Sequence, residues 1–313
     1  MTDGARVFVA GHLGLVGSAI VRRLERRGSL DLILRSRSEL DLTERDAVDA
    51  FFARERPEYV FLAAAKVGGI LANATHPADF IRENILIQTH VIDAAWRNGT
   101  RRLLFLGSSC IYPKHAPQPM SEDSLLTGPL EETNEAYAIA KISGILMGRA
   151  YRRQHGLDFR SLMPTNLYGP GDNFDLETSH VLPALLRKFH EAKEAGRGSV
   201  PVWGTGNVRR EFLHVDDLAD AALFVMEAPE APDLLNVGWG EDLTVRELAE
   251  KIAEVVGFGG RLEFDPSKPD GTPRKLLDVS KISALGWRPR IGLDQGLRET
   301  YAWYVRHRGV AAR

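Results

Sequence analysis

The chain has 313 residues, of which 44% are hydrophobic and 26% charged, and its formal net charge is −2. A length above that of a typical single domain predicts two lobes, or one large fold with an appendage. A net charge near zero gives no field that would attract nucleic acid or an anionic membrane, and no apolar run approaches the ~18 residues of a membrane span. We therefore expect neither partner.

The number of cysteines limits which sites the chain can form, because Cys110 is its single cysteine. One thiol forms no intramolecular disulfide and builds no thiolate metal site, so we expect no metal centre. Such usage is typical of a reducing compartment. Asp3 and the early glycines do not resemble a secretory signal, and we expect a cytoplasmic protein.

Short apolar runs alternate with amphipathic patterns through the first half of the chain. We expect strands at 6–10, 31–35, 58–65, 101–109 and 158–164, and helices at 14–28, 43–57, 77–98 and 134–155. Thr43 is a candidate N-cap of its helix, and Gly28 suits the end of the first one. Apolar strands that alternate with helices predict an α/β fold, a Rossmann-type doubly wound parallel sheet covered on both faces.

The pattern changes after about residue 165, where glycine and proline become more frequent. We expect helices at 180–195, 216–228 and 244–256, and one more strand at 234–240. This half predicts a smaller, partly interwoven substrate lobe. The expected division is a cofactor domain of 1–164 plus about 208–235, and a lobe of 165–207 and 236–313.

The stretch GHLGLVG (11–17) follows the first strand and opens the first helix. Glycines in this context allow a tight turn and a close approach of backbone to a pyrophosphate at the helix N-terminus. The candidate cofactor-binding residues of this loop are Gly11, Gly14, Leu15, Val16 and Gly17. The spacing GxxGxxG resembles that of the extended short-chain dehydrogenase/reductase superfamily.

Arg35 and Arg37 follow the second strand, where an acidic residue would bind the ribose 2′-hydroxyl of NAD. Arginine accommodates a 2′-phosphate instead, so we expect NADP(H) as the cofactor. Two solvated surface arginines are the alternative interpretation.

Ser108, Tyr137 and Lys141 form the catalytic pattern of a ketone reductase. Tyr137 and Lys141 are spaced i, i+4 on one predicted helix, and Ser108 ends the fourth strand. The tyrosine protonates the developing alkoxide, and a nearby ammonium is expected to lower its pKa for this role. Regulators that bind a cofactor without catalysis typically lose the tyrosine or the lysine, whereas this chain keeps all three groups.

Several longer segments resemble one particular family within this superfamily. GSSCIYPK (107–114), MPTNLYGPGDNF (163–174), REFLHVDDLADA (210–221) and KPDGTPRKLLDVSK (268–281) resemble the GDP-L-fucose synthase family nearly from end to end. The resemblance implies that GDP-4-keto-6-deoxy-D-mannose is epimerised at C3 and C5 and then reduced at C4 by NADPH. It also implies a homodimer, for which the helices around 78–98 and 134–155 carry surplus apolar residues.

Epimerisation needs an acid–base pair beyond the reductase residues, and the resemblance assigns Cys110 and His180 to it. A free thiol titrates near ~8.5 and an imidazole near ~6.5, so both exchange protons around neutrality. A buried apolar filler for Cys110 and a surface residue for His180 are the alternatives.

The resemblance also implies binding roles. Further cofactor contacts fall on Asp41, Leu42, Leu106, Lys141, Pro164, Thr165, Asn166, Leu167 and His180. Substrate contacts fall on Lys188, Trp203, Arg210 and Asp270. Arg274 and Lys275 are further candidates for binding phosphate, without an assigned position. Leu13 departs from the family, which often has arginine there, so the preference for NADPH rests on Arg35 and Arg37.

Two other enzyme activities fit the reductase residues, namely a nucleotide-sugar 4-epimerase and a 4,6-dehydratase. Both keep their cofactor bound and recycle its hydride, and both lack the thiol–imidazole pair. A dehydratase also has an acidic residue near the serine, where this chain has Cys110. Net consumption of NADPH separates these alternatives.

Overall fold

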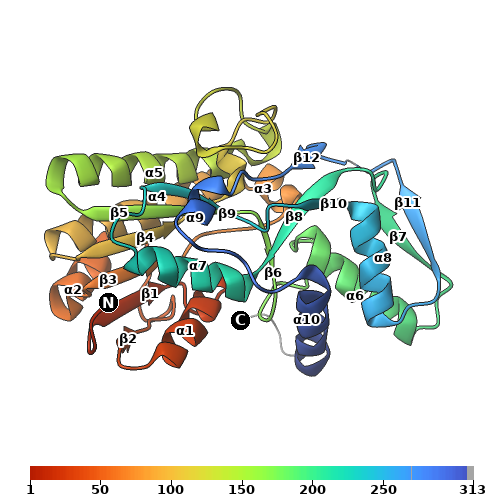
Figure 1. The fold of residues 1–313 in the computed structure, drawn as a ribbon, viewed down its shortest axis with the longest axis horizontal. Helices are drawn as coiled ribbons and strands as arrows, with labels where there is room; N and C mark the ends of the chain where they lie inside the picture. The colour runs from red at the N-terminus through yellow and green to blue at the C-terminus, as the bar shows by residue number, and fades with distance from the viewer. Residues whose placement is uncertain (269, 309–313) are drawn as a thin grey trace.

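The computed structural model describes residues 1–268 and 270–308. Its elements fall into two groups, a large sheet with helices on both faces and a smaller assembly beside it (Figure 1). In the described part of the chain, no helix has the length and apolar character needed to cross a membrane.

Six parallel strands form the main sheet in the order β2-β1-β3-β4-β5-β9. They are β1 (Arg6–Ala10), β2 (Asp31–Ile33), β3 (Tyr59–Leu62), β4 (Arg102–Leu106), β5 (Asp158–Pro164) and β9 (Leu234–Val237). The order reverses at β1, which lies between β2 and β3, and ligands of such sheets bind at the carboxyl ends beside this reversal. The predicted doubly wound parallel sheet is confirmed.

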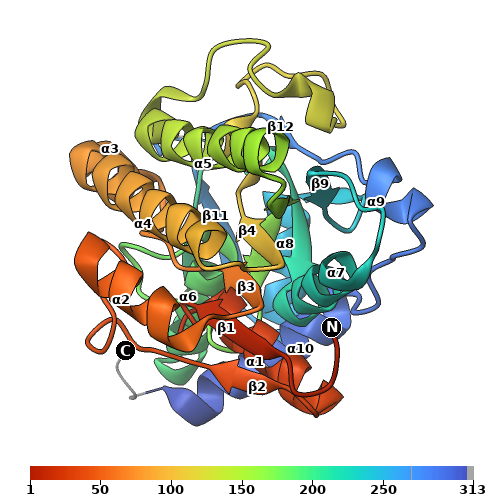
Figure 2. The ribbon, with the colours of Figure 1, turned by 90° about the vertical axis from the view of Figure 1, so that its left-hand side faces the viewer.

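Helices cover both faces of this sheet (Figure 2). One face packs against α2 (Arg45–Glu55), α4 (Pro77–Arg97) and α5 (Glu135–His155), and the other against α1 (Leu15–Arg27), α7 (Val215–Glu227) and α9 (Ser280–Ala284). Side chains of β1 alternate between the two cores, since Phe8 belongs to the first and Val7 to the second. Both faces are buried, which is why the strands are apolar throughout.

The smaller assembly has its own core beneath short strands. The strands are β6 (Asn166–Tyr168), β7 (Ser199–Trp203), β8 (Arg209–His214), β10 (Asp242–Thr244), β11 (Arg261–Asp265) and β12 (Arg274–Lys275). β8 pairs with β6, β10 and β12, whereas β7 pairs with β11. The helices are α6 (Val181–Glu194), α8 (Val245–Val256) and α10 (Leu293–His307), and all three pack on the third core cluster.

The loops at the carboxyl edge of the main sheet contain short helices that bear on the site. These are α3 (Ile70–Thr75), η1 (Ser109–Ile111), η2 (Glu122–Ser124) and η3 (Glu132–Asn134), of which the last three are 3-10 turns. η1 directly follows β4, and η3 runs into α5.

Several sequence-based boundaries need correction. The second helix begins at Arg45, and Thr43 is not its cap, because the Thr43 backbone N–H and hydroxyl both donate to Asp41 Oδ1 at 2.9 and 2.7 Å. The strand predicted over 101–109 ends at Leu106, since the chain turns into η1. The first helix does end at Gly28, whose φ of 71° suits glycine.

Candidate active site

The glycine loop after β1 is shaped for close approach of a ligand to the backbone. Gly11 has a φ of +83°, and a Cβ there would lie 2.7 Å from the backbone nitrogen of Ala64. A Cβ on Gly17 would lie 2.0 Å from the carbonyl oxygen of Gly11. Gly14 is the N-cap of α1 and supplies no capping side chain, so the first N–H groups of the helix are free for an anion. These features fit a dinucleotide pyrophosphate.

The two arginines after β2 differ in how closely other residues of the protein bind their guanidinium groups. Arg35 pairs with Glu55 at 3.1 Å and donates to the carbonyl of Leu34. Arg37 is 71% exposed and has only long contacts, to Asp41 at 3.4 Å and to Glu83 at 3.6 Å. Arg37 is therefore the arginine that can turn to a 2′-phosphate with less loss of existing contacts. Leu13, in the place of the missing arginine, is 60% exposed.

Asp41 and Leu42 lie on the turn that precedes α2. Asp41 accepts the two hydrogen bonds from Thr43, and Leu42 is buried in the first core while its carbonyl contacts His90 Nδ1 at 3.2 Å. The backbone of this turn is thus held in place beside the carboxyl edge of the sheet.

Cys110 and Ser108 meet at the turn after β4. The Cys110 thiol donates to Ser108 Oγ across 3.1 Å, and the Cys110 backbone N–H donates to the same oxygen across 3.4 Å. Ser108 caps η1 by accepting this N–H, which fixes the two side chains relative to each other. Cys110 is 8% exposed, so the residue is buried.

Tyr137 and Lys141 lie one turn apart on α5. The Lys141 ammonium donates to the carbonyl of Leu106 at 2.8 Å and lies 5.7 Å from the centre of the Tyr137 ring. Burial lowers the pKa of Lys141 to about 8, against a smaller opposing effect of Cys110. Its ammonium is therefore charged below pH ~8 and loses its proton as the pH rises through that value.

Desolvation is the main influence on the pKa of the Tyr137 hydroxyl. Burial raises the pKa of Tyr137, Cys110 adds to the increase, and a hydrogen bond with Ser108 opposes it. The expected lowering by Lys141 is wrong for the ligand-free chain, because desolvation of a phenolate outweighs the neighbouring charge. The tyrosine is consequently a protonated phenol, which is the form that can donate a proton.

His180 is the N-cap residue of α6, and its side chain makes no capping hydrogen bond. Much of the residue is exposed, yet protein surrounds the imidazole on most sides, as expected for a group in an open cleft. Burial lowers the pKa of His180, and the charge of Lys275 lowers it further. In the described part of the chain, no hydrogen bond joins His180 to Cys110.

The segment after β5 crosses from the main sheet to the small assembly. Pro164 ends β5, and the backbone N–H of Thr165 donates to Val237 at 3.0 Å. The Thr165 hydroxyl and the Asn166 amide both donate to the carbonyl of Glu211, at 3.1 and 2.8 Å. Leu167 packs against the second core. Side chains here fix the loop, so its backbone is what remains for a cofactor.

Two of the candidate substrate residues face each other across β7 and α6. The Lys188 ammonium lies 5.1 Å from the centre of the Trp203 ring, and the indole is 56% exposed. Burial lowers the pKa of Lys188. A hollow of about 180 Å³ adjoins Lys188 and is floored by Val200 and Pro201. An exposed indole beside a cation suits a base or sugar of a nucleotide.

Arg210, near the start of β8, contacts Asp270. Arg210 donates to the carbonyl of Asp270 at 3.2 Å, and burial lowers the pKa of its guanidinium while Asp270 opposes that change. Both carboxylate oxygens of Asp270 hold the turn at Thr205, at 2.8 Å each. Asp270 therefore shapes the loop, whereas the guanidinium keeps donors for a ligand.

Sequence reasoning missed the contribution of two buried or partly buried charges. Glu211 is fully buried and accepts backbone N–H groups from Gly240 at 2.7 Å and Leu277 at 3.0 Å. Lys275 lies opposite Arg210 in the pairing of β12 with β8, and burial is the main cause that lowers the pKa of its ammonium. The sequence places Lys275 in a cation-rich segment. A strand of two residues is too short for a periodic pattern, so the sequence could not predict which face its side chains occupy.

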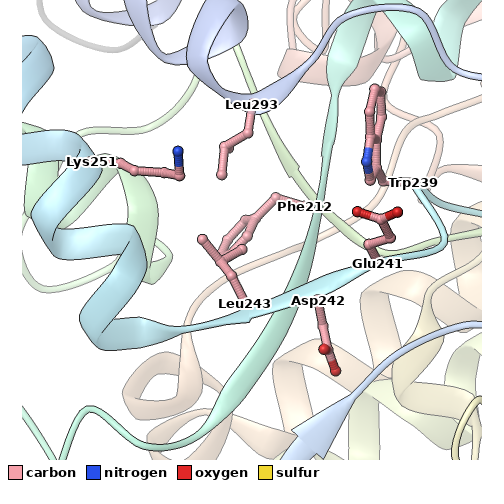
Figure 3. A pocket seen from close by; sticks show the side chains of 7 residues that line it. All are labelled: Phe212, Trp239, Glu241, Asp242, Leu243, Lys251 and Leu293. Carbon is pink, nitrogen blue, oxygen red and sulfur yellow. The ribbon is translucent and has the colours of Figure 1, made fainter.

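These contacts bring several of the candidate residues together. Ser108 contacts Cys110 and Tyr137, Lys141 lies beside the ring of Tyr137, and Lys275 lies opposite Arg210 in the pairing of β12 with β8. Lys188 and Trp203 form a second group on the small assembly. The hollow of about 160 Å³ in Figure 3 is separate, because Phe212, Leu243, Lys251 and Leu293 line it and none of the candidate residues does.

The fold and the candidate site together indicate a dinucleotide-dependent enzyme. Residues 7–238 match the model of the NAD dependent epimerase/dehydratase family, and the chain belongs to that family.

Relatives within the family are close in sequence. The chain is 63% identical over 303 residues to the probable GDP-L-fucose synthase 1 of Oryza sativa subsp. japonica, covering 96% of this chain and 92% of that protein. It is 58% identical to the GDP-L-fucose synthase of Escherichia coli (strain K12), covering 96% of each. The expected resemblance to the GDP-L-fucose synthase family is confirmed.

A solved structure of a protein with a related name has the same fold as this chain. The crystal structure of a GDP-L-fucose synthetase from Naegleria fowleri bound to NADP superposes with a TM-score of 0.92 and 27% identity. The match covers all of this chain and 98% of that one.

Proposed function

We propose that this chain is a bifunctional enzyme that converts GDP-4-keto-6-deoxy-D-mannose to GDP-L-fucose with NADPH. Epimerisation at C3 and C5 comes first, and reduction at C4 follows. Similarity to synthases of this name over nearly the whole chain supports the reaction, and the NADP-bound relative supports the cofactor. The observation that carries the proposal is the 3.1 Å contact between the Cys110 thiol and Ser108, because it puts an acid–base group inside a reductase centre.

The reduction half uses the residues on β4 and α5. The glycine loop would hold NADPH, which would supply a hydride for C4. Tyr137 donates its phenolic proton to the oxygen that becomes the C4 hydroxyl, and Ser108 hydrogen-bonds the same oxygen. The Lys141 ammonium, bound to the Leu106 carbonyl, adds positive charge beneath the ring of Tyr137.

The epimerase half uses Cys110 and His180. The C4 ketone makes the protons at C3 and C5 acidic, and one group of the pair removes a proton while the other returns one on the opposite face. The enolate oxygen formed at C4 is the atom that Ser108 and Tyr137 stabilise. Both halves thus share one oxygen-binding position, which explains why a single cleft can perform both steps.

Substrate binding is assigned to cations and an aromatic ring on the small assembly. Arg210 and Lys188 neutralise the diphosphate, and Trp203 supplies a flat face for the base or sugar. Asp270 orients this region through the turn at Thr205.

Replacing the thiol tests this assignment. We expect Cys110→Ser to lower the incorporation of solvent deuterium at C3 and C5 about 100-fold or more, since a hydroxyl is a poor acid–base group at neutral pH, while NADPH still binds. NMR of the recovered sugar nucleotide measures the exchange, and a fluorescence titration measures NADPH. Ser109→Ala, on the same turn, is the control. Exchange at the wild-type rate in Cys110→Ser contradicts the assignment.

We also propose a cytoplasmic homodimer. Ile139 and Leu146, seven residues apart on α5, are 39% and 42% exposed and share one side of the helix. α4 packs beside α5, so two copies could join these helices into a four-helix bundle. The single cysteine is compatible with a reducing compartment.

A further inference from the structure

β9 is the last strand at one edge of the main sheet. Within residues 1–268 and 270–308 it pairs with β5 and with no other strand. Two loop segments meet beside it instead, since Met120 donates to the carbonyl of Leu276 at 2.8 Å and accepts the N–H of Asp278 at 2.9 Å. The backbone N–H of Asn236 on β9 donates to the buried carboxylate of Glu122 at 2.9 Å. Side chains and loops thus replace a further strand at this edge.

The side chain of Asn236 joins three segments of the chain. Its amide nitrogen donates to the carbonyl of Met120 at 2.9 Å and to the carbonyl of Asp278 at 3.1 Å. Its Oδ1 accepts the hydroxyl of Tyr112 at 2.5 Å. Burial raises the pKa of Tyr112, so this hydroxyl keeps the proton that it donates. Asn236 is fully buried, and both hydrogens of its amide and its oxygen have partners.

Tyr112 ends the short turn that carries Cys110. It is the C-cap residue of η1, two residues after the thiol, and it is buried in the first core. At the other end of η1, Ser108 accepts both the thiol and the backbone N–H of Cys110, at 3.1 and 3.4 Å. The turn is therefore held at both ends, on β4 through Ser108 and on β9 through the Tyr112 hydroxyl.

We propose that Tyr112 is a positioning residue of the epimerase half, which keeps the turn of Cys110 closed through its hydrogen bond to Asn236. The same amide binds the segment after β12, and β12 pairs with β8 beside Arg210. The thiol and a proposed phosphate-binding residue are thus held by one buried side chain. The consequence in catalysis rests on the proposed function, whereas the hold on the thiol belongs to the ligand-free chain.

Alkylation of the thiol tests the hold directly, because Cys110 is the single cysteine and a thiol reagent reports on it alone. The rate of reaction with iodoacetamide is measured in the ligand-free protein. Tyr112→Phe and Asn236→Ser break the same hydrogen bond from its two ends. We expect each to raise the rate about 10-fold, because a buried polar group without its partner destabilises the closed turn. The double variant should react no faster than Asn236→Ser.

Tyr151→Phe is the matched control, since it removes another hydrogen-bonded tyrosine hydroxyl, which donates to Asp93 at 2.9 Å. Its alkylation rate should equal that of the wild type. Low concentrations of urea separate the two routes to reaction, because global unfolding depends steeply on urea and the opening of one turn does not. Wild-type rates in both Tyr112→Phe and Asn236→Ser, an equal rise in Tyr151→Phe, or a rise that follows global unfolding overturns the proposal.

A kinetic experiment extends the test to catalysis. In deuterium exchange at C3 and C5, Tyr112→Phe should lower kcat about 10-fold and leave the KM for the nucleotide sugar unchanged, because no proposed substrate contact is altered. In a Cys110→Ser background the same substitution should cause no further loss, since Tyr112 acts through the thiol. A further loss of equal size there, or an effect confined to KM, contradicts the proposal. If the wild type shows no exchange, the proposed function fails, whereas alkylation still decides the role of Tyr112.

Discussion

At the residue scale, burial is the main influence on the protonation of Tyr137 and Lys141, the proposed reductase pair. Tyr137 is held as a phenol by desolvation, and Lys141 has a pKa of about 8 for the same reason. The two groups therefore do not need a strong mutual effect in the resting chain. What α5 provides is their spacing, with the ammonium anchored on the Leu106 carbonyl.

Removing the phenol separates the two halves of the reaction. We expect Tyr137→Phe to slow the reduction at C4 about 100-fold or more, because the proton donor is lost. Exchange at C3 and C5 should persist, since Cys110 and His180 remain. Oxidation of NADPH followed at 340 nm and NMR of the sugar measure the two steps.

Tyr151→Phe controls for a lost hydroxyl on the same helix, because its hydroxyl bonds Asp93 at 2.9 Å away from the centre. Reduction at the wild-type rate in Tyr137→Phe would contradict the role of this tyrosine.

The sequence predicted the positions of some candidate site residues and not of others. The glycine loop and the i, i+4 pair on α5 follow from local spacing, so their placement could be predicted. The position of Lys275 depends on pairing between β12 and β8, which are 60 or more residues apart in the chain. Contacts formed by such distant segments leave no local pattern in the sequence.

At the element scale, the long amphipathic helices and the buried strands were predictable because a strong period or a continuous apolar run marks them. α5 spans Glu135–His155, almost the range expected from its pattern. The short strands of the small assembly were missed. In β7 only Val200 and Val202 are buried, and two buried residues in a strand of five give too weak a pattern to predict it.

The exposed side of α5 allows a test of the proposed dimer. We expect Leu146→Glu to weaken self-association, because a carboxylate in an apolar helix interface loses its hydration. Analytical ultracentrifugation over a range of concentrations measures the change. Val305→Glu on α10 is the control, since Val305 is similarly exposed at 38%. A monomeric wild type, or a Leu146→Glu variant as dimeric as the wild type, contradicts the proposed interface.

At the scale of the whole molecule, the proposed site residues come from both the main sheet and the small assembly. β9 returns the chain to the main sheet after β8, so the two parts are interwoven. We keep the division into a cofactor domain and a substrate lobe as a proposal. Its functional meaning is that Ser108, Tyr137 and Lys141 come from one part and Arg210 and Lys275 from the other.

The central claim is that one cleft performs two epimerisations and one reduction. Incubation with GDP-4-keto-6-deoxy-D-mannose and NADPH in D₂O, followed by NMR of the product, tests it most directly. The account predicts GDP-L-fucose with deuterium at C3 and C5, hydrogen from NADPH at C4, and one NADPH consumed for each product. A C4-reduced sugar without deuterium at C3 and C5, or turnover without net consumption of NADPH, would contradict it.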